Sequence, residues 1–209
     1  NHDIYYRNTN KVNAVQELCT APDGINEPFI YEEPKVVDFD GTKILMMPWI
    51  NPENEAHSLH ILSTAEADVC MGHFDLNGFR MMDHMVQTHG YDKSIVSRFE
   101  KTYSGHFHHK NDDGQVFYLG SQYEMTWSDY GNQKGFHVFD TKTRELEFVP
   151  NPLKIFKKIM YNDKETNYDK LDIKDFNQKF VKLIVVHKKD NQMFDRFLER
   201  LYTKISVHE

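Results

Sequence analysis

The sequence predicts an α/β domain followed by a small α+β unit. Short apolar runs typical of buried strands alternate with segments at helical spacing through most of the chain. Residues 149–152 read Val-Pro-Asn-Pro, and two prolines in four residues indicate a domain boundary. With 209 residues, 39% of them hydrophobic, the chain is long enough for one well-packed domain and a smaller one. We therefore expect domains at residues 1–150 and 151–209.

The pattern of apolar residues predicts the elements of the first domain in order. Val12, Val15 and Leu18 recur at helical spacing, and Asp40-Gly41 is a turn typical of a β-hairpin. The expected elements are a helix over 9–19, a hairpin of 36–40 with 43–47, a helix over 53–63, a buried strand over 67–71, a short helix over 93–99, and strands over 102–104, 115–120, 135–140 and 144–149. In the second domain, strands over 154–161 and 179–188 precede a helix over 190–202.

Charge is divided unevenly between the two domains. The net charge is −7, but residues 1–151 hold 12 Lys and Arg against 23 Asp and Glu, whereas residues 152–209 hold 13 against 9. The acidic residues 1–151 fit a site that binds divalent cations, and the basic residues 152–209 fit an element that binds polyanions. The alternative is two solvated surfaces of different composition.

Other features narrow the class of protein. No apolar stretch is long enough to span a membrane, so we expect no membrane partner. Cys19 and Cys70 match no metal or redox spacing, which favours reduced, buried thiols in a cytoplasmic protein.

Histidines follow two of the predicted strands, each directly after a glycine. Residues 104–109 read Ser-Gly-His-Phe-His-His, and in an extended segment His106 and His108 would point to one face while His109 points to the other. Gly105 lets backbone and ligands approach closely. His73 repeats the Gly-His-Phe pattern. Neutral imidazole is a common ligand of divalent transition metals. The alternatives are a surface cluster and, for His73, a histidine that caps a core strand.

The chain begins Asn1-His2-Asp3, a third group with metal-site chemistry. An Asn oxygen can ligate a hard metal, and His2 could protonate a leaving oxygen without binding metal. Asp3 would then orient an imidazole or a loop. The alternative is a frayed chain end with three polar residues.

Taken in order, Asn-His-Asp, a strand ending in Gly-His, and Gly-His-x-His resemble the back half of the calcineurin-like metallophosphoesterase signature. The stretches "MGHFDLNGF", "YSGHFHHK", "VFYLGSQYEMTW" and "KGFHVFDTKTRELEFVPN" resemble the phage recombination endonuclease subunits, which are SbcD-type nucleases of DNA double-strand-break repair. The resemblance covers residues 1–151. It implies the C-terminal portion of an αββα sandwich, with residues 151–209 as a DNA-binding capping domain.

The resemblance also implies roles for single residues. Asn1, His73 and His106 would bind one metal and His108 the other, while His2 would contact the scissile phosphate. Phe74, Asp75 and Asn77 would line the site wall. Two divalent metals are implied, Mn²⁺ first and Mg²⁺ as an alternative. The activity would be two-metal hydrolysis of DNA phosphodiester bonds. Three lysines of the cap would contact the DNA backbone: Lys154, Lys157 and Lys158.

The sequence departs from the family's pattern at its start. The family's Asp-x-His and Gly-Asp motifs precede Asn-His-Asp, and neither is present, so we expect a fragment that binds metal poorly. The implied partners are DNA, an SbcC-type ATPase subunit and a second copy of the nuclease, in the cytoplasm of a host cell. Three alternatives stay open: a metallophosphoesterase acting on a cyclic nucleotide or phosphoprotein, a non-catalytic, metal-poor interaction subunit, and an α/β domain with incidental histidines.

Overall fold

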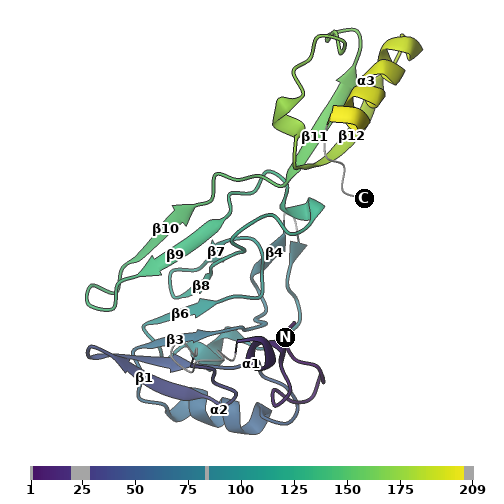
Figure 1. The fold of residues 1–209 in the computed structure, drawn as a ribbon. Coiled ribbons are helices and arrows are strands. Elements are labelled where there is room, and N and C mark those ends of the chain that lie inside the picture. The colour runs from purple at the N-terminus through teal and green to yellow at the C-terminus, as the bar shows by residue number, and fades with distance from the viewer. Residues whose placement is uncertain (1, 20–28, 83–84, 205–209) are drawn as a thin grey trace. The chain divides into compact units, whose positions relative to one another are not determined.

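The chain folds into two compact units, each built from helices and strands. The structure is a computed structural model that describes residues 2–19, 29–82 and 85–204 (Figure 1). Unit 1 comprises residues 1–121 and 136–149, and unit 2 comprises residues 122–135 and 150–209. This architecture confirms the mixed α/β class.

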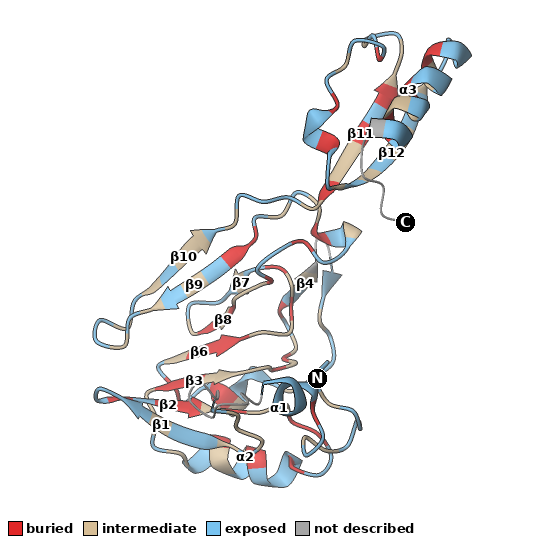
Figure 2. Ribbon diagram, in the orientation of Figure 1, coloured by how far each residue is buried: buried red, intermediate tan, exposed pale blue. Residues whose placement is uncertain are grey.

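A six-stranded sheet forms the centre of unit 1. Its order is β1 (Lys35–Phe39), β2 (Thr42–Met46), β3 (Val69–Gly72), β6 (Lys101–Ser104), β8 (Val116–Tyr118) and β7 (Asn111–Asp112). The four inner strands are parallel, and the two edge strands pair antiparallel to their neighbours. Strands β3, β6 and β8 are largely buried (Figure 2). Burial on both faces explains the apolar sequences of β3 and β8.

The predicted hairpin of β1 and β2 is confirmed. Asp40 and Gly41 both have positive φ, 53° and 96°, which is the conformation of a tight two-residue hairpin turn. Thr42 pairs with Phe39 directly beyond the turn, and Lys43 pairs with Asp38 next. The turn therefore fixes the register of the strand that leads toward Trp49.

Two apolar clusters lie on opposite faces of the sheet and define the layers of unit 1. Leu45 and Cys70 belong to one cluster, and their neighbours Ile44 and Val69 belong to the other. Helix α2 (Glu55–Thr64) and the 3₁₀ helix η1 (Lys93–Val96) contribute Leu62 and Val96 to the first cluster. The hairpin of β9 (Gly135–Phe139) and β10 (Leu146–Pro150) packs Phe139 and Leu146 on the second. The described residues thus form helix, sheet and sheet layers, while the four-layer metallophosphoesterase sandwich stays a prediction.

The first predicted helix is shorter than expected. Helix α1 spans Ala14–Leu18 and buries none of its residues. The backbone before it is paired elsewhere, because the N–H of Tyr5 donates to Val12 and the N–H of Ala14 donates to Asp3. The helix therefore begins only at Ala14, and Val12 stays outside it. A second short element, the hairpin of β4 (Arg80–Met82) and β5 (Met85–Val86), was not predicted.

The two cysteines differ in burial. Cys70 lies in the core, and burial raises the pKa of its thiol. Cys19 is exposed, so the prediction of buried thiols is wrong at that position. No helix of the described residues is long and apolar enough to cross a bilayer.

Unit 2 contains the predicted two strands and helix. β11 (Phe156–Asn162) and β12 (Phe180–His187) pair in parallel, with the 3₁₀ helix η3 (Lys174–Phe176) between them in sequence. Helix α3 (Asn191–Lys204) follows, and its Met193, Phe197 and Leu201 recur every fourth residue and pack on the sheet.

Residues 122–135 belong to unit 2, although the sequence analysis placed them in the first domain. The buried carboxylate of Glu124 accepts hydrogen bonds from the N–H groups of Ile155 and Phe156, at 2.8 and 3.0 Å. Trp127, in the 3₁₀ helix η2 (Trp127–Asp129), packs on Phe156 with ring centroids 4.6 Å apart. These contacts join the segment to the start of β11, and no sequence pattern in it indicates them.

Candidate functional site

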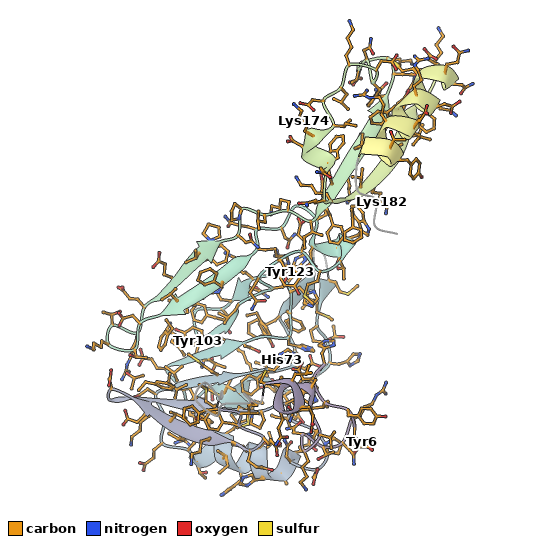
Figure 3. The ribbon with its side chains drawn as sticks, in the orientation of Figure 1. Tyr6, His73, Tyr103, Tyr123, Lys174 and Lys182 are labelled. Atoms are coloured by element: carbon orange, nitrogen blue, oxygen red, sulfur yellow. The ribbon has the colours of Figure 1, made fainter. Side chains whose placement is uncertain are left out.

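Three aromatic side chains gather where adjacent parallel strands of unit 1 end. Trp49 follows β2, His73 follows β3 and His106 follows β6, and Gly72 pairs with Ser104 in the register of the last two strands. Because parallel strands end at one edge of the sheet, these residues lie together there. Figure 3 marks His73 at this edge. Trp49 was not singled out from the sequence, although its place just after a predicted strand is the signal that indicated His73.

The imidazoles of His73 and His106 face each other. Nε2 of His73 lies 3.3 Å from Nδ1 of His106, with the rings nearly perpendicular at 80°. The indole of Trp49 lies 5.7 Å from each imidazole, measured between ring centroids. The structure therefore brings His73 and His106 together, while their role as metal ligands stays a prediction.

Gly105 makes room for the ring of His73. A β-carbon at position 105 would lie 2.8 Å from Nδ1 of His73, closer than real side chains approach. His106 has φ of 70°, so the extended conformation expected for this segment is wrong at that residue. Burial nevertheless alternates as predicted, since Phe107 and His109 are buried while His106 and His108 are partly exposed.

The carboxylate of Asp75 lies next to the ring of His106. Oδ1 of Asp75 lies 3.6 Å from Nε2 of His106, and it accepts a hydrogen bond from Nε2 of Gln87 at 2.7 Å. The backbone of Asp75 is also fixed, because its carbonyl accepts the N–H of Tyr91 at 2.9 Å. Asp75 thus faces the ring nitrogen of His106 that does not point at His73. Nothing in the sequence indicates the contact with Gln87.

Burial keeps both imidazoles neutral near pH 7. It lowers the pKa of His73 to about 3, and the charges of His106, His2 and His108 add to this effect. Burial also lowers the pKa of His106, while the charge of Asp75 opposes the shift. A metal ligand must be deprotonated, so this electrostatic environment suits imidazoles that bind metal. The contributions of His2 and His108 also mean that both lie within electrostatic range of the pair.

The chain start is held beside this edge. The carbonyl of Asp3 accepts the N–H of Ala14 at 2.7 Å, and the amide of Asn10 donates to the carbonyl of Trp49 at 2.9 Å. The alternative interpretation, a frayed chain end, is therefore wrong for Asp3. His2 and Asp3 are exposed, and Asp3 lines a pocket of about 260 Å³ together with Trp49 and His73. Asn1, a predicted metal ligand, lies outside the described residues.

The histidine pair fits a divalent metal as two of its ligands. Nε2 of His73 and Nδ1 of His106 are imidazole nitrogens 3.3 Å apart, and imidazole nitrogen is a donor that divalent transition metals bind. Within the part of the chain that the structure describes, no three His, Cys, Asp or Glu side chains are arranged to hold a metal ion. The pair alone therefore cannot complete a coordination sphere.

The three predicted DNA-contacting lysines do not share one surface. Lys158 lies on the opposite face of β11 from Lys157, whose ammonium lies 6.0 Å from the ring of Phe176. Lys154, just before β11, donates to the carbonyl of Asn132 at 3.0 Å. Only Lys158 lies on the face of the two-stranded sheet that α3 does not cover.

Taken together, unit 1 is a mixed α/β domain with a partly buried, neutral histidine pair at the carboxyl edge of its parallel strands. The chain is 34% identical over 208 residues to "Exonuclease subunit 1" of Enterobacteria phage T4, and the match covers 99% of this chain. It spans 59% of the length of that relative. The predicted resemblance to a phage nuclease subunit is thus confirmed, and the similarity extends beyond residues 1–151 to nearly the whole chain. No family model matches, so the wider metallophosphoesterase assignment stays a prediction.

Proposed function

We propose that this chain is part of a metal-dependent DNA nuclease that hydrolyses phosphodiester bonds in recombination or repair. The observation that carries the proposal is the pair of neutral imidazoles, 3.3 Å apart, at the carboxyl edge of the sheet. The relative over 99% of the chain bears the name of an exonuclease subunit, which supports DNA as the substrate.

In this proposal the metals are two divalent cations, with Mn²⁺ first and Mg²⁺ as the alternative. His73 and His106 would hold one metal together with Asn1, and His108 would contribute to the other. When bound, such ions supply an activated water and stabilise charge on the phosphate.

The chain's own residues do the rest of the proposed work. Gly105 and burial keep His73 close to His106 and unprotonated. Asp75 orients His106 from the side away from the pair. His2, exposed and within electrostatic range of the pair, would protonate the leaving oxygen. The αββα sandwich and the capping role of unit 2 belong to the same proposal.

The partners are also proposed. The relative is named as a subunit, so we infer that the whole protein acts with a second subunit, of the SbcC-type ATPase class, and with a second copy of itself. Its DNA substrate would place it in the host cytoplasm.

Degradation of linear duplex DNA by the full-length protein, with and without Mn²⁺, tests the activity. We expect degradation that needs the metal and falls at least 100-fold in the His73→Ala/His106→Ala variant. His60→Ala is the matched control, because His60 is exposed on α2. Calorimetric titration with Mn²⁺ gives a second readout, and the double variant should lose the binding that the control retains.

Two outcomes would contradict the proposal. If the full-length protein hydrolyses a small phosphodiester such as bis-p-nitrophenyl phosphate but leaves DNA intact, the small-substrate phosphoesterase is correct. If neither substrate is cleaved and Mn²⁺ does not bind, the non-catalytic interaction subunit is correct.

A further inference from the structure

The two-stranded sheet of unit 2 has one covered face and one open face. Ile159, Tyr161 and Leu183 point into the core with α3. Because side chains alternate along a strand, the residues between them lie on the other face. Exposure is high there, with Met160 55% exposed and Phe180 44% exposed. Helix α3 does not cover this face, and at one end of it Trp127 of η2 packs on the buried Phe156.

Two lysines lie directly opposite each other on the open face. Lys158 of β11 pairs with Lys182 of β12 in the register of the sheet. Like charges at opposed positions destabilise a sheet. Among the described residues, neither lysine forms an ion pair with a carboxylate. The open face therefore carries two positive charges that no acidic side chain of the described chain compensates. Figure 3 labels Lys182 on β12.

Aromatic rings lie beside both ammonium groups. Nζ of Lys158 lies 4.4 Å from the ring centre of Tyr130, and Nζ of Lys182 lies 5.4 Å from that of Trp127. Phe156 and Phe180 pair across the strands at the same end, with centroids 5.7 Å apart. Two cations and several aromatic rings thus share one surface, which we call the Lys158–Lys182 face and define as Trp127, Tyr130, Lys158, Phe180 and Lys182.

Packing and hydrogen bonds position the ring of Trp127. Trp127 packs on Phe156 and follows the N-cap Thr126, whose N–H donates to the carboxylate of Asp129 at 2.9 Å. Asp129 in turn forms a buried ion pair with Lys134 at 2.8 Å. A platform that is ordered before binding loses little entropy when a ligand stacks on it.

We infer that the Lys158–Lys182 face binds a single strand of nucleic acid. The inference rests on the proposed action on DNA and adds to it a place for unpaired bases. Lysines with aromatic side chains beside them match a chain of phosphates that carries stackable bases. Duplex DNA hides the faces of its bases, so the aromatic rings favour a single strand. A protein partner suits the face less well, because lysine is depleted in protein interfaces.

Fluorescence anisotropy of a labelled oligothymidine, measured in EDTA with the full-length protein, tests the inference without any cleavage. The Lys158→Gln/Lys182→Gln variant should bind at least 10-fold more weakly. The slope of log affinity against log salt should fall by about 1.4, which corresponds to two phosphate contacts on a single strand. The matched control is Lys164→Gln/Lys174→Gln, which removes the same charge from the loop between the strands. Equal loss in both variants, or no loss in either, would overturn the inference and leave the face to a protein partner.

Trp127 provides a readout of stacking. The 209-residue chain has two tryptophans, so when this chain is used in a Trp49→Phe background all tryptophan emission comes from Trp127. Oligothymidine should quench this emission, while an abasic strand of the same length should not. Equal quenching by both strands would contradict base stacking. Because no step needs metal or hydrolysis, a failure of the nuclease proposal and a failure of this inference are distinguishable.

Discussion

A β-carbon at Gly105 would lie 2.8 Å from Nδ1 of His73, so the imidazole occupies the space that any larger residue at position 105 would need. The two residues follow neighbouring strands, β6 and β3. Their close approach directs His73 toward His106. It also couples the backbone of one strand end to the side chain of the other.

The first prediction tests this coupling. Gly105→Ala should destabilise unit 1 by about 1–3 kcal/mol, because the added methyl group overpacks against the ring. In a His73→Ala background the same change should cost nothing or stabilise by up to about 1 kcal/mol. Denaturant unfolding of the four proteins in the cycle measures the difference. Additive effects would show that the ring and the glycine are not coupled.

The charge of Asp75 should raise the pKa of His106. Asp75→Asn keeps the oxygen that accepts from Gln87 but removes the negative charge, so the pKa of His106 should fall further below its usual value. Proton NMR of the imidazole during a pH titration measures this shift. Loss of an outer partner typically weakens metal affinity by about 10–100-fold, which a Mn²⁺ titration checks. An unchanged or raised pKa would contradict the assigned role.

The buried pair of Lys134 and Asp129 should stabilise unit 2. Both side chains are at most 2% exposed, and Lys134→Met would leave the carboxylate buried without its cation. We expect a loss of about 3 kcal/mol in the free energy of unfolding, near the lower end of the range for breaking a buried pair. Arg196→Met is the control, since its ion pair with Asp169 is exposed and should contribute little. Equal effects of the two substitutions would show that burial of the pair is not important.

Asp163 should make unit 2 sensitive to acid. Desolvation works against ionisation of its carboxyl, but the N–H groups of Asp190 and Lys189 and the ring of His187 lower its pKa to about 2. The folded pKa lies below the unfolded value of about 3.9. The unfolded state therefore binds more protons between these values, and stability is complete above about pH 4 and lost as the pH falls toward 2.

Circular dichroism of acid unfolding checks this expectation. Asp163→Asn should lower stability at neutral pH and flatten the dependence between pH 4 and pH 2. If the variant shows the same slope as the unchanged protein in that window, another carboxyl is responsible. Asp169→Asn serves as the comparison, because Asp169 is paired with Arg196 on an exposed surface.

Much of the fold could be predicted because local patterns specify it. The hairpin at Asp40-Gly41, helix α2 and the sequence of strand, strand and helix in unit 2 follow from turn chemistry and apolar spacing. The length of helix α1 was overestimated, because the carbonyl of Val12 accepts a hydrogen bond from the N–H of Tyr5, which lies before the predicted helix. Residues 122–135 pack with unit 2, because Glu124 and Trp127 contact the start of β11, and no local pattern in the sequence indicates these contacts.

The sequence by itself determined the class of fold, the histidines that follow two strands, and the similarity to phage recombination nucleases. Only the tertiary structure decided which of these side chains meet. The parallel pairing of β3 with β6 brings His73 within 3.3 Å of His106, and the same edge adds Trp49 and Asp75. The pairing of β11 with β12 sets Lys158 opposite Lys182 and separates it from Lys157. Strand order and register depend on contacts between distant segments, and no periodicity within one segment encodes its neighbours.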